Sequence, residues 1–543
     1  MSSSVTIRQE RHFGGRLVRC FADRLGDSYE ALVRAAGVHG ARDAVVFGEA
    51  RISYSELLAE VGRVATGLAQ TGIRPGDRIA LLCGNRPEFV TILYGALKLG
   101  AIVVPLDMRL RAPEIAYIVN NSGAALLAYA QKLAGEVPAA DDLPEYCRTL
   151  AIPENGRLFD GIGEGDEADR HVPRSEEDVA LVVFTSGTTG RPKGAMLTHL
   201  NIEHSCQHFH LAIDITAADR IGVVTPVTHI TGLIMGVMGT LHAGAAVLLM
   251  ETFKAANFIA FAERERMTQI VMVPAMYSLC LLEDSFDKAD LSAWRVGNYG
   301  GAPMPEGVIL ALAEKLPRLQ LVNGYGATET CSPATMLRPG EGVERAYSVG
   351  RALHCVDLKI VDREGNELPA GEAGEILIAG PMVATGYWQN PEATEIGFAD
   401  GYWRSGDVGS LDEEGYLRIH DRIKDVVNRG GYKIYSAEVE NVLSRYGGVV
   451  ESAVVGRPSP VLGERVHAFV SVASGEVTVE QLQAFCAGQL ADYKVPESFT
   501  ITMERLPRNA NGKLDKKGLR ETTQSMPDIE PRRKRESETT SGT

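Results

Sequence analysis

Residues 185–194 read TSGTTGRPKG, a run of four hydroxyl side chains, three glycines and two basic residues. They follow the short apolar run 179–184, which is typical of a buried strand. Glycines let backbone N–H groups approach an anion, hydroxyls add donors, and Arg191 and Lys193 add positive charge. The residue order differs from a Walker A loop, in which lysine directly precedes Ser or Thr. Two interpretations are open, a loop that binds a polyphosphate and a solvated Gly/Thr turn, and the pattern favours the first.

Five later segments also combine glycines with charged, hydroxyl or aromatic residues. In chain order they are 323–329 (NGYGATE), 402–407 (YWRSGD), 421–425 (DRIKD), 428–433 (NRGGYK) and 507–513 (PRNANGK). Each is a weak signal by itself, because Asp407 and Lys513 both lie in sequences typical of solvated turns. Tyr325 is equally compatible with plain core packing. The segments therefore acquire a chemical meaning only when they are taken together.

The residues between these segments predict the elements that position them. Up to about residue 420, short apolar runs alternate with helical patterns, which indicates an α/β fold of layered sheets and helices. Ser53 and Glu56 form a capping box at the start of a helix that runs to Gln70. Buried strands are predicted at 77–82, 101–105, 245–250 and 268–273.

The pattern changes twice toward the C-terminus. A hairpin signal at 358–368 and a strand at 374–379 predict a β-rich subdomain. After Asp421 comes a small α+β segment, with helices predicted at 436–445 and 478–490 and strands at 452–455 and 466–472. Residues 521–543 show no apolar periodicity and are expected to be disordered.

Length and composition limit the class of protein. A chain of 543 residues is too long for a single core, and its net charge of −15 argues against general nucleic-acid binding. No apolar stretch is long enough to span a membrane, and the first residues lack the apolar region of a secretory signal. Eight scattered cysteines without a C-x-x-C pattern predict reduced thiols and a cytoplasmic location.

In this order, the loop at 185–194 and the five later segments resemble the motifs of the adenylate-forming superfamily, which includes acyl-CoA synthetases, non-ribosomal adenylation domains and luciferases. The stretch from Gly374 through Gly386-Tyr387 to 390–394 (NPEAT) extends the resemblance, which is greatest to a fatty or aryl acyl-CoA ligase. It implies a large N-terminal domain at 1–421, a small mobile C-terminal domain at 422–521 and a tail at 522–543.

The resemblance implies an enzyme that joins a carboxylic acid to ATP, releases pyrophosphate, and passes the acyl group from acyl-AMP to coenzyme A. Carboxylate and polyphosphate repel each other, so positioned cations should dominate catalysis. Glu329 would ligate Mg²⁺, Thr328 would contact the α-phosphate, and Thr185 would help to hold the β- and γ-phosphates. The implied ATP and AMP contacts are Thr185, Ser186, Gly187, Thr188, Thr189, Gly190, Lys193, Gly301, Ala302, Pro303, Asn323, Gly324, Tyr325, Gly326, Thr328, Asp407, Arg422 and Lys513.

Several of these roles belong to the small domain or its border. By the resemblance, Lys513 is the lysine that reaches the substrate carboxylate and the α-phosphate, and it would be catalytic together with Glu329, Thr328 and Thr185. Asp407 would accept hydrogen bonds from both ribose hydroxyls, with Arg422 near the same ribose.

Three further positions would serve the second half-reaction. Lys424 would lie at the hinge about which the small domain turns. Gly430 and Gly431 would line the pantetheine tunnel, where absent side chains leave room for the thiol arm. Many relatives have proline before the Glu438 segment, and this chain has Ser436-Ala437 instead. That departure affects the local rigidity expected of the loop rather than the chemistry.

The acyl pocket implied by the resemblance holds no Arg or Lys for a second carboxylate and no Asp for an amino group, which favours an apolar fatty, branched or aryl acid. Its residues are His229, Ile230, Thr231, Met235, Val273, Met276, Tyr299, Gly300, Gly301, Ala302 and Met304. His229 matches a gate position, and its sequence neighbours do not support a metal-ligand role. An enzyme that loads a carrier protein is the alternative. The expected partner is a small carboxylic acid, without nucleic acid or a membrane span, and a homodimer is compatible with the sequence.

Overall fold

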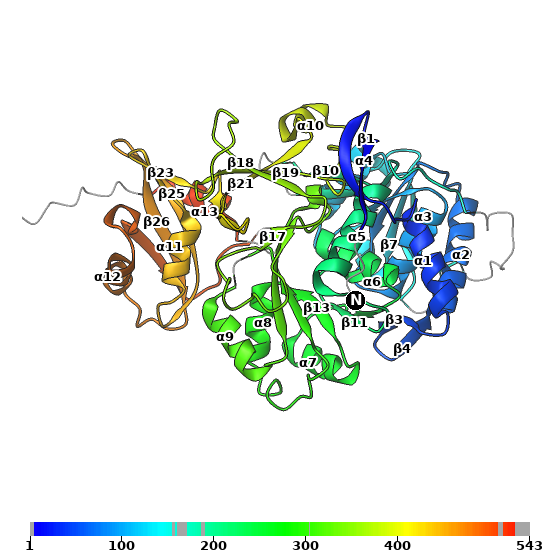
Figure 1. Cartoon of the computed structure of the whole chain (residues 1–543), viewed down its shortest axis with the longest axis horizontal. Helices are drawn as coiled ribbons and strands as arrows, with labels where there is room; N and C mark the ends of the chain where they lie inside the picture. The colour runs from blue at the N-terminus through cyan, green and yellow to red at the C-terminus, as the bar shows by residue number, and fades with distance from the viewer. Residues whose placement is uncertain are drawn as a thin grey trace, which may run out of the picture. The chain divides into compact units, whose positions relative to one another are not determined.

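The structure is a computed structural model, and it describes residues 5–154, 158–159, 171–185, 191–302, 304–508 and 514–526. The chain divides into two compact units, residues 1–405 with 409–419, and residues 406–408 with 420–543. Each unit mixes helices and sheets (Figure 1), so the predicted α/β class is confirmed. The division at residues 421 and 521 stays a prediction.

The first unit contains a six-stranded sheet that carries the polyphosphate loop. Its strand order is β10 (Lys193–Thr198), β9 (Val179–Thr185), β6 (Ile102–Pro105), β5 (Arg78–Leu82), β7 (Leu126–Ala130) and β8 (Arg148–Ile152). All neighbours are parallel except β9 and β10, which form an antiparallel hairpin around the loop. The strand predicted at 179–184 is therefore confirmed, and so are those predicted at 77–82 and 101–105.

A nine-stranded sheet forms the second layer of this unit. Its order is β17 (Arg351–Ala352), β16 (Thr335–Met336), β15 (Gln320–Tyr325), β14 (Val296–Tyr299), β13 (Gln269–Met272), β11 (Arg220–Val223), β12 (Ala246–Leu249), β3 (Asp43–Phe47) and β4 (Ala50–Ser53). The strands from β15 to β3 run parallel, and antiparallel strands close both edges. Parallel strands place their carboxyl ends along one edge, where α/β proteins bind ligands.

Helices cover both faces of the nine-stranded sheet. The larger core lies between the two sheets and the helices α1 (Ser28–His39), α2 (Tyr54–Gln70), α3 (Pro87–Lys98) and α5 (His199–Ile213). A second core lies on the opposite face, against α7 (Ala255–Arg264), α8 (Pro274–Leu281) and α9 (Glu306–Lys315), which Figure 1 shows grouped together. The predicted helix is confirmed with its capping box, because Ser53 and Glu56 exchange side-chain and backbone hydrogen bonds at the start of α2.

Smaller elements complete the first unit. These are α4 (Ala112–Ser122), the π-helix η4 (Gly232–Gly239), α6 (Thr240–His242), the 3₁₀ helix η5 (Thr328–Thr330) and α10 (Pro391–Gly397). A five-stranded sheet comprises β18 (Asp357–Val361), β19 (Gly374–Ala379), β21 (Tyr402–Leu411), β20 (Phe398–Ala399) and β22 (Leu417–Arg422). The β-rich subdomain predicted from the hairpin signal at 358–368 and the strand at 374–379 is therefore present.

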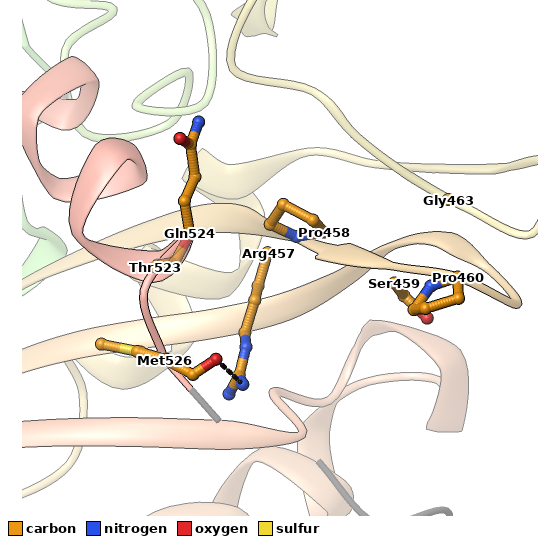
Figure 2. Close-up of a pocket in the computed structure, with 8 residues that line it drawn as sticks. All are labelled: Arg457, Pro458, Ser459, Pro460, Gly463, Thr523, Gln524 and Met526. Carbon is orange, nitrogen blue, oxygen red and sulfur yellow. Dashed lines mark hydrogen bonds between the residues drawn. The ribbon is translucent and has the colours of Figure 1, made fainter. Parts of the chain in front are cut away.

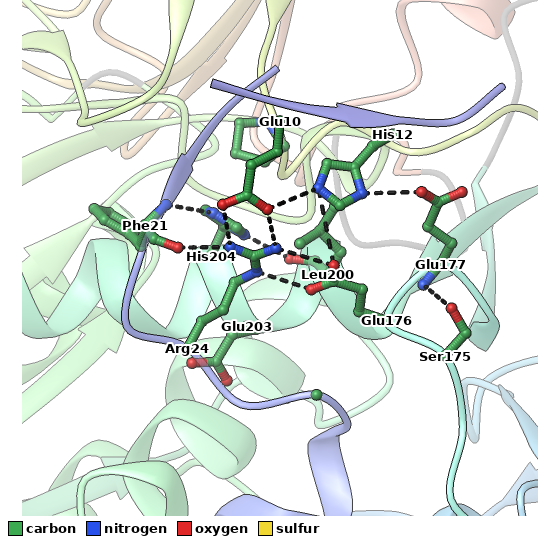
Figure 3. Close-up of polar contacts among 12 residues, drawn as sticks. Glu10, His12, Phe21, Arg24, Ser175, Glu176, Glu177, Leu200, Glu203 and His204 are labelled. Atoms are coloured by element: carbon green, nitrogen blue, oxygen red, sulfur yellow. Dashed lines mark hydrogen bonds and ion pairs between the residues drawn. The ribbon is translucent and has the colours of Figure 1, made fainter. Parts of the chain in front are cut away.

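The N-terminal hairpin of β1 (Ile7–His12) and β2 (Arg16–Phe21) is fixed to the first unit by ion pairs (Figure 3). Arg24 lies between Glu10 and Glu176, at 2.6 and 2.8 Å. The side chains of Glu10, His12 and Cys20 place ligand-type atoms within 4.8 Å of one another. Arg24 already donates to both carboxylate oxygens of Glu10, so this cluster fastens the hairpin.

The second unit is a small α+β body around its own core. Its sheet orders β24 (Tyr432–Ile434), β23 (Val427–Arg429), β26 (Gly463–Val472) and β25 (Val449–Ser459), with β27 (Ser498–Thr502) parallel to β26. Its helices are α11 (Ser436–Leu443), α12 (Val479–Gln489) and α13 (Lys516–Thr523). The last of these includes residues 521–523 of the segment 521–543 that the sequence predicts to be disordered, and residues 527–543 lie outside the described part of the chain.

Two sequence-level expectations concern the whole chain. All eight cysteines are described, and each is a free thiol. In the described part of the chain, no helix combines the length and the apolar character that crossing a membrane requires.

Candidate active site

The residues predicted for the acyl pocket lie at or after the carboxyl ends of three strands, β11, β13 and β14, and the adjacent strand β15 carries the start of the segment 323–329. His229 lies in the segment after β11, Val273 directly follows β13, and Tyr299 ends β14. Tyr299 is in register with Asn323 of β15, which begins the segment 323–329. The structure therefore brings the predicted acyl-binding and nucleotide-binding segments together at one edge of the sheet.

Close backbone packing explains one of the glycines at this edge. A Cβ atom on Gly300 would lie 2.7 Å from the carbonyl oxygen of Gly324, so the two strand ends leave no room for a side chain there. Asn323 is buried, and its side chain donates to the Ser348 carbonyl at 3.1 Å, which fixes the start of the neighbouring segment. Pro303 lies outside the described residues.

The predicted acyl residues differ in burial. Ile230, Met235, Tyr299 and Met304 are buried, whereas Thr231 and Met276 are half-buried and Val273 is exposed. Burial also raises the pKa of Tyr299 to about 12, which keeps its phenol protonated at neutral pH. The predicted residues therefore give an apolar interior with a more open rim.

Asn298 is a residue of this region that the sequence patterns did not single out. It is buried on β14 between Val271 and Val322 of the adjacent strands, and its Nδ2 lies 3.7 Å from the sulfur of Met235. Within the described residues, its Oδ1 has no hydrogen-bond partner. A buried amide oxygen without a partner is costly, so this atom is suited to a ligand or to water.

His229 is held by a carboxylate from the other sheet. Its Nε2 lies 3.1 Å from Oδ2 of Asp107, which follows β6. Arg109 donates to both oxygens of the same carboxylate, at 2.9 and 2.8 Å. Burial raises the pKa of Asp107, but the hydrogen bonds from Arg109 and His229 outweigh that effect and hold the pKa well below its usual range. The predicted gate histidine is thus anchored by an ionised aspartate that the sequence patterns did not identify.

The two ends of the polyphosphate loop are fixed by the β9–β10 hairpin. Thr185 and Lys193 are register partners, and the Thr185 hydroxyl lies 3.4 Å from the Lys193 carbonyl oxygen. Arg191 lies over the ring of Tyr117, 5.4 Å from its centroid, and the Tyr117 hydroxyl donates to Pro192 O at 3.1 Å. The predicted phosphate-binding residues Ser186, Gly187, Thr188, Thr189 and Gly190 lie outside the described residues.

Glu329, the predicted magnesium ligand, is the middle residue of η5 and is buried. The Tyr387 hydroxyl donates to its Oε1 at 2.9 Å, and the backbone N–H of Ala384 donates to its carbonyl oxygen at 2.8 Å. Burial raises the pKa of Tyr387, and the Glu329 carboxylate raises it further, so the phenol stays a donor. Thr328 and Tyr325 are half-buried, and Tyr325 packs partly against the core of the five-stranded sheet.

Predicted residues of the second unit occupy two places within it. Asp407 is buried and forms an ion pair with the more exposed Arg422, with an Nε–Oδ1 distance of 3.2 Å. Burial lowers the pKa of Lys424, the predicted hinge residue. Gly430 and Gly431 form the turn between β23 and β24, with φ of 57° and 93°. This turn requires positive φ, so their presence has a structural reason independent of coenzyme A. Lys513 lies outside the described residues.

Ser436, which stands near the departure from the family pattern, takes part in a buried network. Its backbone N–H and hydroxyl both donate to Oδ2 of Asp421, and Lys516 donates to its hydroxyl at 2.7 Å. These contacts fix the start of α11 in the absence of proline.

A separate hollow of about 360 Å³ lies in the second unit (Figure 2). It is lined by Arg457, Pro458, Ser459, Pro460, Gly463, Thr523, Gln524 and Met526. Arg457 is buried there and donates to the Met526 carbonyl at 3.1 Å. The described lining includes none of the predicted site residues.

Comparisons with known proteins identify the family of the chain. Residues 32–388 match the model of the AMP-binding enzyme family, and residues 438–513 match that of the AMP-binding enzyme C-terminal domain. A feruloyl-CoA synthase of Amycolatopsis sp is 37% identical over 493 residues, which are 90% of this chain and 97% of the relative. The long-chain-fatty-acid–CoA ligase FadD13 of Mycobacterium tuberculosis is 35% identical over 482 residues, 87% of this chain and 93% of the relative.

The fold of this chain is similar to that of a solved structure. The crystal structure of the anthranilate CoA ligase AuaEII with anthranoyl-AMP aligns with a TM-score of 0.84 at 25% identity, and it covers 92% of this chain and 97% of that one. The chain therefore belongs to the AMP-binding enzyme family, as an acyl-CoA synthetase that uses ATP and coenzyme A.

Proposed function

We propose that this enzyme activates an apolar carboxylic acid, of the fatty, branched or aryl class, at the strand-end edge of the nine-stranded sheet. One observation carries the proposal: the segment after β11 holds buried Ile230 and Met235, the end of β14 holds buried Tyr299, and Tyr299 is in register with Asn323 on the adjacent strand. The names of the relatives, which act on feruloyl, anthraniloyl and long-chain fatty acyl groups, support this class.

Asn298 favours an aryl acid with a polar ring substituent over a plain alkyl chain. A buried hydrogen-bond acceptor in a pocket costs free energy when it has no donor, so the pocket discriminates against a ligand that supplies none. Asn298 Oδ1 is such an acceptor. The Asn298 side chain lies on the sheet face that also holds Val271, and its Nδ2 contacts the sulfur of Met235.

In the first half-reaction, a carboxylate oxygen of the acid bonds to the α-phosphorus of ATP, and the bond from that phosphorus to the bridging oxygen breaks, so that pyrophosphate leaves. Thr185 and Lys193 would hold the departing phosphates, and Thr328 the α-phosphate. Glu329 fits a magnesium ion because it is a buried carboxylate restrained by a neutral donor, and hard cations prefer oxygen ligands. Magnesium supplies charge neutralisation on the phosphates when it is bound.

In the second half-reaction, the coenzyme A thiol loses its proton to solvent, its sulfur bonds to the acyl carbonyl carbon, and the carbon–oxygen bond to the phosphate breaks, so that AMP leaves. Asp407 and Arg422 would bind the ribose of the nucleotide. Lys424 would be the hinge between the two arrangements, and Gly430 and Gly431 would leave room for the pantetheine arm. A cytoplasmic, homodimeric enzyme remains part of this proposal.

A panel of acids tests the proposal. Pyrophosphate release is measured with ATP and Mg²⁺, with coenzyme A, without it, and with a purified acyl carrier protein in its place. We expect release with apolar or aryl acids and thioester formation on coenzyme A. Matched aryl acids with and without a ring hydroxyl test Asn298, since Asn298→Leu should remove any preference between them. Pyrophosphate from none of the acids would overturn the proposal.

Lys513→Ala separates the two steps. Acyl-AMP formation should fall by about 10²-fold or more, because a positioned cation at the reacting phosphate is lost. Thioester formation from supplied acyl-AMP should be largely spared. Equal loss in both assays would contradict the role proposed for Lys513.

A further inference from the structure

The segment 384–388 joins the strand after the polyphosphate loop to the residue predicted to bind magnesium. On one side, Met196 donates to Gly386 O at 2.9 Å and Trp388 donates to Gly194 O at 2.7 Å, both in backbone bonds with β10. On the other side, the backbone N–H of Ala384 donates to Glu329 O at 2.8 Å. The segment therefore lies between Lys193, at the start of β10, and Glu329.

Tyr387 makes this link with its side chain as well as its backbone. It forms an isolated β-bridge with Ala195 of β10, and its hydroxyl donates to Glu329 Oε1 at 2.9 Å. Lys193 Nζ lies 5.2 Å from the centroid of the Tyr387 ring. The ring also makes an edge-on contact with Phe398, with 5.4 Å between the ring centroids. Packing and hydrogen bonding thus hold one buried phenol between the loop lysine and the carboxylate.

The residues around Tyr387 are shaped to hold it in place. Gly386 has a φ of 148°, and a Cβ atom there would lie 2.5 Å from Cγ2 of Thr394, so glycine is required. The Tyr387 backbone N–H donates to the Thr394 hydroxyl at 2.9 Å, and Asn390 caps α10 through the backbone N–H of Ala393 at 3.0 Å. The segment from Gly386 to Thr394 therefore fixes the position of the Tyr387 side chain.

We propose that Tyr387 is a positioning residue for Glu329, and that it couples the orientation of this carboxylate to the strand that carries Lys193. The inference rests on the proposed function, because it assigns Glu329 to the cation that accompanies ATP. A phenol restrains a carboxylate without cancelling its charge, whereas an arginine or lysine would neutralise it. Outer partners of this kind tune metal affinity by about 10- to 100-fold.

The variant Tyr387→Phe removes the hydroxyl and keeps the ring against Phe398. Binding of Mn²⁺, in the presence of an ATP analogue whose α–β bridge cannot be cleaved, is followed by electron paramagnetic resonance. We expect a Mn²⁺ dissociation constant about tenfold higher than in the wild type. In turnover, the half-saturating Mg²⁺ concentration should rise by a similar factor, and saturating Mg²⁺ should restore most of the rate.

The matched control is Tyr54→Phe. Tyr54 is also a buried phenol, and its hydroxyl donates to the Ala245 carbonyl at 2.6 Å, in the helical layer of α2. This control should lower thermal stability and leave Mn²⁺ affinity unchanged. Weaker Mn²⁺ binding in both variants to the same degree would assign the effect to general loosening and overturn the proposal.

A double variant makes the test independent of folding. If Tyr387 acts through Glu329, Tyr387→Phe should have little further effect on Mn²⁺ affinity once Glu329→Gln is present. Additive losses, or an unchanged Mn²⁺ affinity in Tyr387→Phe while Glu329→Gln weakens it, would refute the coupling. Failure of the wild type to release pyrophosphate from any acid would instead defeat the proposed function, and the Mn²⁺ measurements distinguish that case.

Discussion

Two carboxylates of the first unit, Glu329 and Asp107, show how the kind of donor decides what an acidic residue can do. The Asp107 carboxylate accepts hydrogen bonds from the Arg109 guanidinium group and lies within hydrogen-bond distance of the His229 ring nitrogen, and 13% of its side chain is exposed. Glu329 is buried, and its Oε1 receives the neutral Tyr387 hydroxyl. The charge of Asp107 is balanced by Arg109, so this residue serves as a scaffold for His229. A hydroxyl contact leaves carboxylate charge in place to attract a cation.

The largest expected effect comes from exchanging the charged carboxylates for amides. Glu329→Gln should lower the rate of acyl-AMP formation by about 10²- to 10³-fold, because charge stabilisation at the phosphates is lost. Asp107→Asn should lower it by no more than about tenfold, because an amide still accepts a hydrogen bond from His229. Pyrophosphate release at saturating acid measures both variants. Similar losses of rate in the two variants would contradict the distinction between Glu329 as a cation ligand and Asp107 as a scaffold.

A smaller effect is expected from Gly386→Ala, which leaves both carboxylates intact and disturbs the segment that holds Tyr387. The added methyl meets Thr394 in a backbone conformation that alanine rarely adopts, at a cost of about 1–3 kcal/mol. Thermal stability should fall, and the half-saturating Mg²⁺ concentration should rise several-fold.

Gly365→Ala is the matched control for this variant. Gly365 has a φ of 90° in the turn after β18, and nothing lies within 4 Å of an added Cβ atom. The Gly365→Ala variant should be less stable than the wild type, and its half-saturating Mg²⁺ concentration should be unchanged. A shift in that concentration in Gly365→Ala would show that Gly386 has no special role.

The sequence predicts best those parts of the molecule that local patterns determine. The capping box of Ser53 and Glu56, the helix it begins, and the helix after Thr478 all form as the spacing indicates, because their hydrogen bonds close within one turn. The buried strands follow from runs of apolar residues. The segments that the family motifs predict for the acyl group and the nucleotide follow strands of one parallel sheet, and their roles stay predictions.

The contacts that position the site could not be predicted in the same way. The bond from Tyr387 to Glu329 joins residues 58 positions apart, and that from His229 to Asp107 spans 122 positions. No periodicity relates such residues, and only the packing of two sheets and a connecting segment brings them together. Asn298 is similar, since an amide within an apolar strand becomes informative only once its oxygen is seen to lack a partner among the described residues. The N-terminal hairpin was not predicted, because β1 is largely exposed and has little apolar pattern, although its partner β2 buries Val18, Cys20 and Phe21.

The smallest effect expected is that of Asp107→Asn on stability, and its pH dependence sharpens the comparison. The folded pKa of Asp107 lies below the value of about 3.9 for an unfolded aspartate, so ionised Asp107 stabilises the fold above that pH. This contribution is lost as the pH falls through the folded pKa. Arg109 is half-exposed, so we expect a difference of about 1 kcal/mol between wild type and variant.

Melting temperatures of both proteins should therefore differ by a constant amount between about pH 5 and 7, and the difference should shrink below about pH 4. A gap that stays constant or widens on acidification would mean that the carboxylate is not held ionised by Arg109 and His229. In that case the charge of Asp107 would not be committed to Arg109 and His229, and the scaffold role assigned to Asp107 would be wrong. A difference in melting temperature that shrinks on acidification would instead confirm that Arg109 and His229 hold Asp107 ionised and balance its charge, as its role as a scaffold for His229 requires.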